Sequence, residues 1–271
     1  MRLRKRSGPG LSFEAFGVRL QLSYDDPELK PRVDQILPPG WAHCELDSSA
    51  TSFALRQTGP GEYEVTIAGI PALEHGSLEV ALTMLDSQMR LVIAANAQDR
   101  LFVHAGVVSL EGRALVIPGG SFTGKTTLVE ALVRAGATYY SDEYALLDDA
   151  GRVHPYPRPL SIRSDDGTAA RDRRADLIGR VAGDEQAELA TVVMTRYQAG
   201  AEWRPRRVST GRGVLALLAN TVPAQDRPEE SLRTLRRAVA GATTLEGVRG
   251  EAAPAAGALL DELASLAHVD V

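Results

Sequence analysis

The sequence predicts an α/β core with mixed β-sheets over residues 99–271, preceded by a small α+β module over residues 1–98. Two observations predict this arrangement. In the second half, an apolar strand, a glycine-rich loop and an amphipathic helix follow one another, and strand-like and helix-like segments continue to the C-terminus. In the first half, alternating strand patterns lead into one long segment with helical spacing of apolar residues.

Composition excludes several classes of protein. The chain has 271 residues and a net charge of −5, which argues against a nucleic-acid partner. Cys44 is the sole cysteine, so no disulfide can form within the chain. No apolar run approaches the roughly 18–20 residues that cross a bilayer, so we expect no membrane span. The basic start, Met1 to Arg6, leads into no apolar core, and we therefore expect a cytoplasmic protein.

The N-terminal module is predicted to contain strands and helices, and its sequence shows no set of residues typical of a catalytic site. Residues 16–23 alternate as one strand, and residues 27–37 form a short helix that Pro38-Pro39-Gly40 stops. Residues 52–57 and 62–67 alternate around Gly59-Pro60-Gly61, which predicts a hairpin. Apolar spacing from Leu78 to Ala95 predicts a helix.

The core is predicted to begin with two strands, residues 101–110 and 113–118, that turn at Glu111-Gly112. A helix follows the glycine-rich loop and ends at Gly136, where a C-terminal cap belongs. The remaining predicted elements are strands at 137–141, 191–197 and 243–247, helices at 229–240 and 252–267, and a polar loop at 164–176.

The glycine-rich loop at residues 119–126, called the phosphate loop below, matches the pattern G-x-x-x-x-G-K-[ST]. This pattern is typical of loops that bind phosphate. Its residues are Gly119, Gly120, Ser121, Phe122, Thr123, Gly124, Lys125 and Thr126, with Thr127 next in the helix. Glycines let backbone N–H groups converge on phosphate oxygens, and the following helix directs its positive dipole end at the same anion. Lys125 adds a charge for the β- and γ-phosphates, and the Thr126 hydroxyl is placed to bind Mg²⁺. Strand, loop and helix in this order are the context that the motif requires.

Two adjacent acids, Asp142 and Glu143, follow a short strand only 17 residues after Lys125. One carboxylate can hold Mg²⁺, and the other can accept a proton from an attacking hydroxyl. Because adjacent strand residues point to opposite faces, one residue for each task is geometrically natural. The alternative without a function is that Asp142 and Glu143 only end a strand. Asp148-Asp149 is predicted to form an ordinary turn.

Histidine and arginine side chains complete the candidate site. His104 lies on a strand that leads toward the phosphate loop, where a packed core histidine is the alternative interpretation. Arg158, Arg163 and Arg196 follow the acid pair, and an arginine aimed at the γ-phosphate can stabilise transition-state charge. For each of these arginines, the alternative is a solvated surface side chain.

Together, His104-Ala-Gly-Val-Val, the phosphate loop and Ser141-Asp142-Glu143 resemble the HPr kinase/phosphorylase family, whose nucleotide-binding core phosphoenolpyruvate carboxykinase shares. The spacings of 21 residues from His104 to Lys125 and 17 residues to Asp142 match without gaps. The segments 154–163 and 191–197 are similar to the HPr-kinase-related subgroup, which includes kinases that phosphorylate lasso peptide precursors.

The resemblance implies a phosphoenolpyruvate carboxykinase-like P-loop core and an ATP- and Mg²⁺-dependent kinase acting on a serine hydroxyl of a peptide or protein. By family role, Asp142 would be the base, and Glu143 would support Mg²⁺. His104 would lie near the transferring phosphoryl group, and Lys125 and Thr126 would hold phosphates and metal. A homo-oligomer is compatible with this assignment.

Two departures from the family keep other functions open. The family usually has glycine where this chain has Phe122, and a phenylalanine at positive φ costs about 1 kcal/mol or more. The segment that couples kinase to phosphorylase activity is absent, which argues against HPr as the substrate. The alternative function is a catalytically impaired nucleotide-binding scaffold or sensor in peptide maturation. A small-molecule carboxykinase-like enzyme is a third, disfavoured because a second metal-binding Lys/His pair is missing.

Overall fold

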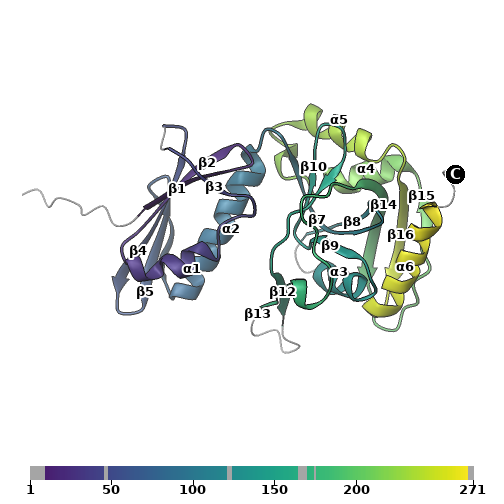
Figure 1. The fold of residues 1–271 in the computed structure, drawn as a ribbon, viewed down its shortest axis with the longest axis horizontal. Coiled ribbons are helices and arrows are strands. Elements are labelled where there is room, and N and C mark those ends of the chain that lie inside the picture. The colour runs from purple at the N-terminus through teal and green to yellow at the C-terminus, as the bar shows by residue number, and fades with distance from the viewer. Residues whose placement is uncertain (1–9, 46–47, 121–123, 164–169, 174, 268–271) are drawn as a thin grey trace, which may run out of the picture. The chain divides into compact units, whose positions relative to one another are not determined.

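The computed structural model describes residues 10–45, 48–120, 124–163, 170–173 and 175–267 (Figure 1). The chain divides into two compact units, residues 1–99 and residues 100–271. Each unit is built on its own mixed sheet, as the α/β fold class predicts.

The sheet of the N-terminal unit has six strands in the described part of the chain, in the order β3-β1-β2-β4-β5-β6. Only the β2–β4 pair is parallel among the pairings described for this sheet. The strands are β1 (Gly10–Ala15), β2 (Val18–Tyr24), β3 (Ala42–His43), β4 (Thr51–Gly59), β5 (Glu62–Ile67) and β6 (Ile70–Gly76). The helices are η1 (Pro27–Leu29), α1 (Lys30–Asp34) and α2 (Leu78–Asn96).

Helix α2 confirms the helical spacing read from the sequence. Its N-cap residue Ser77 accepts a hydrogen bond from the backbone N–H of Val80, and Leu85, Met89 and Ile93 are fully buried along one stripe. The predicted β4–β5 hairpin is also confirmed. The single strand predicted at 16–23 is wrong at its start, because Phe16 and Gly17 adopt positive φ and form the turn between β1 and β2.

The C-terminal unit is built on a sheet of eight strands within the described residues. The order is β11-β10-β7-β8-β14-β16-β15, with β9 paired to β7. The bounds are β7 (Leu101–Leu110), β8 (Arg113–Pro118), β9 (Thr138–Ser141), β10 (Tyr144–Leu147), β11 (Val153–His154), β14 (Glu188–Tyr197), β15 (Arg206–Val208) and β16 (Thr243–Arg249). Strands β8, β14 and β16 run parallel to one another, so their carboxyl ends meet at one edge of the sheet.

Helices cover both faces of this sheet. The helices are α3 (Lys125–Arg134), α4 (Thr210–Leu218), η3 (Val222–Ala224), α5 (Pro228–Ala238) and α6 (Ala252–Ala267). Leu115 and Ile117 of β8 pack in one core cluster with α3 and α6, whereas Ala114 and Val116 pack in the other with α4 and α5. The alternation of side chains along β8 thus places α3, which follows the phosphate loop, on a defined face of the sheet.

The C-terminal unit differs from the sequence prediction in several places, and β10, β11 and β15 were not predicted. The predicted loop at 164–176 is wrong at Ala170–Arg173, which forms β13 and pairs with β12 (Leu160–Arg163), and η2 covers Ala175–Leu177. Residues 164–169 and 174 lie outside the described residues. Helix α4 was not predicted, because Gly211 and Gly213 lower the helix propensity of this segment. The helix forms nevertheless, because Val214 and Leu217 pack on the sheet and this packing outweighs the low propensity.

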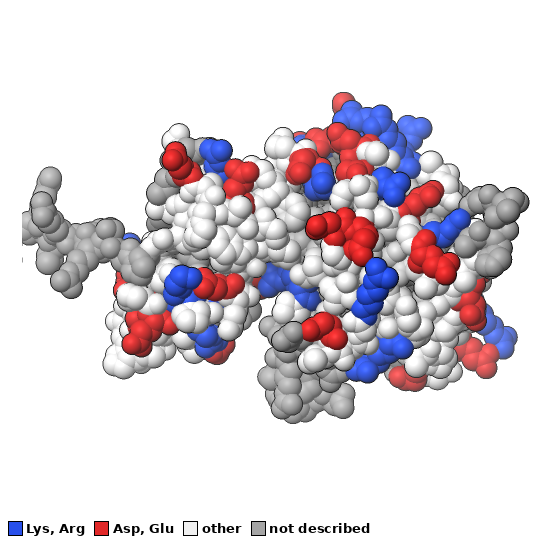
Figure 2. Space-filling model, viewed as in Figure 1, with Lys and Arg blue, Asp and Glu red and all other residues white. Residues whose placement is uncertain are grey.

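The surface matches the mildly acidic composition. Figure 2 shows acidic and basic side chains intermixed over most of the visible face, with arginines gathered over α5. Among the described residues, no helix is both long enough and apolar enough to cross a membrane.

Gly106 sets how closely β7 approaches α3, and this contact gives a testable prediction. A Cβ at Gly106 would lie 2.6 Å from Cγ2 of Val129, so Gly106→Ala forces the Val129 side chain, or the helix that carries it, to shift. We expect this overpacking to lower the free energy of unfolding by about 1–3 kcal/mol in urea denaturation.

The matched control is Gly257→Ala in α6, where an added Cβ meets no atom of the described residues within 4 Å. Because alanine is the better helix former, this control is expected to keep or raise stability. Equal stability of the two variants would contradict the close approach of β7 and α3.

Candidate active site

The phosphate loop connects β8 to α3 at the carboxyl edge of the sheet. The backbone N–H of Gly119 donates to the carbonyl oxygen of His104 (3.2 Å), which ties the start of the loop to β7. Ser121, Phe122 and Thr123 lie outside the described residues, and the structure resumes at Gly124. Helix α3 begins at Lys125 and ends before Gly136, whose φ is 112°, so the strand, the helix and its C-terminal cap lie where the sequence predicts them.

Two observations favour glycine at position 124. As N-cap of α3 it is left-handed, with φ 80° and ψ 18°, which glycine adopts without steric cost. An added Cβ would also lie 2.6 Å from Nη2 of Arg249, whose guanidinium donates to the Gly124 carbonyl oxygen (2.9 Å). A side chain at this position would therefore disturb both the loop and its contact with β16.

Lys125 is a buried cation at the start of α3, with only 9% of the residue exposed. Its Nζ donates to the carbonyl oxygen of Gly120 (2.6 Å) across the loop. Burial lowers the pKa of Lys125 from its ordinary 10.5, and the carboxylates of Asp142 and Glu143 oppose this shift. Both acids therefore act electrostatically on the loop lysine.

Asp142 joins the acid pair to the phosphate loop. Thr126 Oγ1 donates to its Oδ2 (2.9 Å), and the hydroxyl of Tyr139 lies 2.9 Å from its Oδ1. The same Tyr139 hydroxyl lies 3.0 Å from the carbonyl oxygen of Arg158, so two acceptors share one proton. Burial, and then Asp142, raise the pKa of Tyr139, which keeps the phenol neutral and a hydrogen-bond donor.

Asp142 and Glu143 lie in a bend between β9 and β10, and not within a strand. The prediction that the two side chains point to opposite faces of a strand therefore does not apply to them. The hydroxyl of Ser141 holds the bend, because its Oγ accepts from the backbone N–H groups of Glu143 (3.0 Å) and Tyr144 (2.9 Å). Ser141, the first residue of the Ser141-Asp142-Glu143 motif, therefore fixes the backbone that carries both acids.

His104 lies in β7, half-buried, opposite Tyr144 of β10. The two rings are tilted by 38° with centroids 4.6 Å apart. Strand alternation places His104 on the same face of β7 as Gly106, the face that α3 covers.

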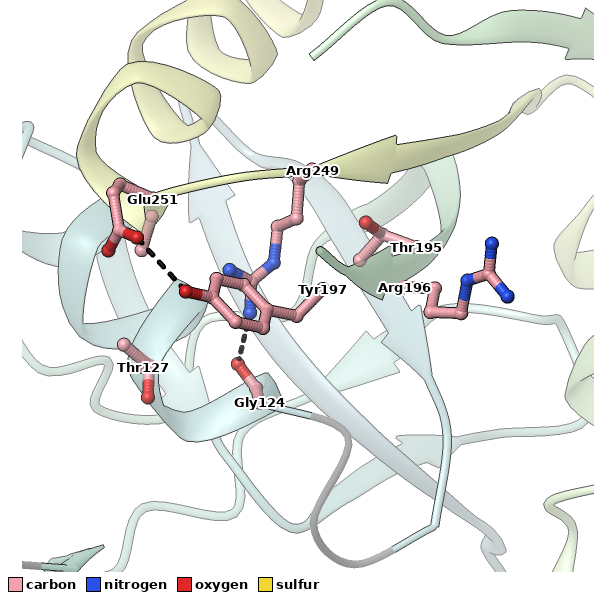
Figure 3. A pocket seen from close by; sticks show the side chains of 8 residues that line it. Gly124, Thr127, Thr195, Arg196, Tyr197, Arg249 and Glu251 are labelled. Carbon is pink, nitrogen blue, oxygen red and sulfur yellow. Dashed lines mark hydrogen bonds between the residues drawn. The ribbon is translucent and has the colours of Figure 1, made fainter. Parts of the chain in front are cut away.

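The predicted arginines differ in placement. Arg163 is in β12, and its side chain is not among those described. Arg158 contributes its carbonyl oxygen to Tyr139. Arg196, near the end of β14, is exposed, and Figure 3 shows its guanidinium directed away from Gly124.

Sequence reasoning did not single out three side chains at this edge, which are Tyr197, Arg249 and Glu251. They line a pocket of about 580 Å³ together with Gly124 and Thr127 of the loop–helix junction (Figure 3). Tyr197 ends β14, which pairs with β8, and Arg249 ends β16, which pairs with β14, so both residues lie at the carboxyl edge of these parallel strands. The rule that ligands bind outside the carboxyl ends of parallel strands would have indicated both residues.

Oxygen donors near Lys125 suit a hard cation. Among the described residues, no group of three His, Cys, Asp or Glu side chains could hold a metal. The Thr126 hydroxyl and the Asp142 carboxylate lie in hydrogen-bond contact, with Glu143 adjacent in the bend. Mg²⁺ is usually bound by one or two carboxylates plus phosphate and water oxygens, so this donor set fits a metal that enters with a phosphate.

Of three comparisons with known proteins, the search of solved structures finds matches. No protein-family model matches the chain, and no curated protein matches it. A search of solved structures finds the HPr(Ser) kinase/phosphatase from Coxiella burnetii. The two chains are 14% identical, and the match covers 62% of this chain and 97% of that one, with a TM-score of 0.35.

Proposed function

We propose that the C-terminal unit is an ATP- and Mg²⁺-dependent kinase that transfers the γ-phosphoryl group to a serine-type hydroxyl of a peptide or protein. The hydrogen bond of 2.9 Å from Thr126 Oγ1 to Asp142 Oδ2 carries this proposal. It joins the first turn of α3, which follows the phosphate loop, to a carboxylate. A phosphate chain held by the loop would therefore end beside a base.

Phosphate binding would use the loop and the N-terminal end of α3. Free backbone N–H groups and the helix dipole favour an anion at this end. Lys125 would exchange its bond to the Gly120 carbonyl oxygen for a phosphate oxygen. Because its ammonium is buried, its attraction to phosphate is screened less than that of a surface lysine.

Thr126, Asp142 and Glu143 would hold Mg²⁺. When bound, the metal would neutralise developing charge on the phosphate oxygens. We assign the metal to these residues because their donors are hard oxygens and Thr126 and Asp142 are in contact.

Asp142 would act as the base in the transfer step. The serine oxygen forms a bond to the γ-phosphorus, the bond from that phosphorus to the bridging oxygen breaks, and ADP leaves. The serine proton passes to a carboxylate oxygen of Asp142, since each such oxygen can accept more than the one hydrogen bond it has here. His104 would lie near the transferred group, and Arg163 would clamp phosphate oxygens. Arg196, whose guanidinium is directed away from Gly124, would have to turn toward the loop to join this clamp.

Phosphoryl transfer to serine tests the proposal directly. The intact protein is mixed with γ-labelled ATP, Mg²⁺ and paired peptides that carry serine or alanine at one position. We expect label only on serine peptides.

A second candidate function, the catalytically impaired nucleotide-binding scaffold or sensor, is favoured by Phe122 at a position that is usually glycine. Saturable ATP binding without label on any peptide would support that candidate and overturn the kinase.

A further inference from the structure

The pocket beside the phosphate loop contains polar groups that no described residue satisfies. Arg249 is only 3% exposed, and its two terminal nitrogens donate to the carbonyl oxygens of Gly124 and Gly250. Its Nε is buried, and so is the Oγ1 of Thr195, and neither atom has a hydrogen-bond partner among the described residues. Both residues line the pocket, and buried polar atoms are normally paired, so these atoms point to a ligand.

The pocket also presents an open aromatic ring. The guanidinium of Arg249 lies 5.5 Å from the centroid of the Tyr197 ring and covers one face of it. Tyr197 is nevertheless 49% exposed, so the opposite face is free for a planar group. The Tyr197 hydroxyl donates to Oε1 of Glu251 (3.1 Å), which holds the ring across the pocket (Figure 3).

The charges indicate an uncharged occupant. The carboxylate of Glu251 repels an anion, and the terminal nitrogens of Arg249 already bind backbone carbonyls. The guanidinium of Arg196 is directed away from Gly124. A flat aromatic face beside a carboxylate instead suits a heterocyclic base, which stacks and carries N–H donors.

We propose that this pocket binds the nucleoside of the phosphate-donating nucleotide, with its base stacked on the open face of Tyr197. The inference rests on the proposed kinase function. Gly124, the N-cap of α3, and Thr127 in its first turn also line the pocket, so the phosphate chain runs from the pocket into the loop. A volume of about 580 Å³ lies within the ordinary range for small-ligand sites.

Arg249 is the positioning residue of this arrangement. One side chain supports the Tyr197 ring and binds the carbonyl oxygen of Gly124 at the N-cap of α3. A single guanidinium from β16 therefore fixes the position of the Tyr197 ring relative to the start of α3.

Calorimetric titration of the intact protein with ATP and with inorganic tripolyphosphate, each with Mg²⁺, separates the two sites. Wild type should bind ATP more tightly than tripolyphosphate. Tyr197→Ala should weaken ATP binding about 5- to 150-fold, the range expected for one stacked base, and leave tripolyphosphate binding unchanged. Tyr197→Phe keeps the ring and should retain most of the ATP affinity.

Tyr197→Leu serves as the second variant, since it keeps an apolar side chain without a π-face and should behave as Tyr197→Ala does. Equal losses for ATP and tripolyphosphate in both variants, or no loss for either ligand, would overturn the nucleoside site. Failure of wild type to bind tripolyphosphate would instead overturn the phosphate loop assignment, and with it the proposed function.

Discussion

Asp142→Asn is expected to reduce phosphoryl transfer to serine by about 10²- to 10⁴-fold, the contribution typical of a positioned base. Asparagine has almost the same shape, and its amide can still form hydrogen bonds with the hydroxyls of Thr126 and Tyr139. It cannot take up the serine proton. ATP affinity should therefore stay nearly intact while the rate of transfer collapses.

The rate is measured with γ-labelled ATP and a serine peptide, and affinity by calorimetry on the same samples. Asp149→Asn is the matched control, because it removes the same charge from an exposed turn next to β10. That control should transfer phosphate as wild type does. Retained transfer in Asp142→Asn would remove the base assignment.

Lys125→Ala is expected to weaken ATP binding by about 10- to 150-fold, equivalent to about 1.5–3 kcal/mol for a hydrogen bond to a charged group. The loss is large because Lys125 is buried, and the Asp142 and Glu143 carboxylates then face the phosphates without a cation between them. Tripolyphosphate binding should fall by the same factor, since the lysine serves the phosphate chain.

The pH dependence of binding checks the same residue. Only the ammonium form attracts phosphate, and burial lowers the pKa of Lys125 from 10.5. Wild-type ATP affinity should therefore decline as the pH rises through this lowered pKa, and the Lys125→Ala affinity should not follow that decline. Lys30→Ala removes an exposed lysine that pairs with Asp34 in the N-terminal unit, and it should match wild type. An unchanged affinity in Lys125→Ala would contradict the phosphate loop assignment.

Local patterns predicted much of this architecture. The strand and helix that flank the glycine-rich loop, and the Glu111-Gly112 turn, are encoded by neighbouring residues, so a single stretch of sequence suffices to find them. The β4–β5 hairpin and α2 follow from period-2 and helical patterns for the same reason. The strand predicted at 16–23 began inside a turn, because a phenylalanine at positive φ carries no local signal.

Contacts between distant segments could not be read in this way. Arg249 reaches Gly124 across 125 positions, and Tyr197 reaches Glu251 across 54. Tyr139 binds Asp142 through a spacing of three residues, yet its role depends on the bend that Ser141 holds. The pairing of β12 with β13 likewise brings a polar stretch into a strand, where composition alone indicates a loop.

A crystal structure of the intact protein with Mg²⁺ and a non-hydrolysable ATP analogue tests the central claim most directly. The triphosphate is expected to lie along residues 119–127, with its terminal phosphate between the Nζ of Lys125 and the carboxylate of Asp142. Lys125 should then have left the carbonyl oxygen of Gly120. A triphosphate bound elsewhere, or an Asp142 carboxylate turned away from the terminal phosphate, would contradict the account.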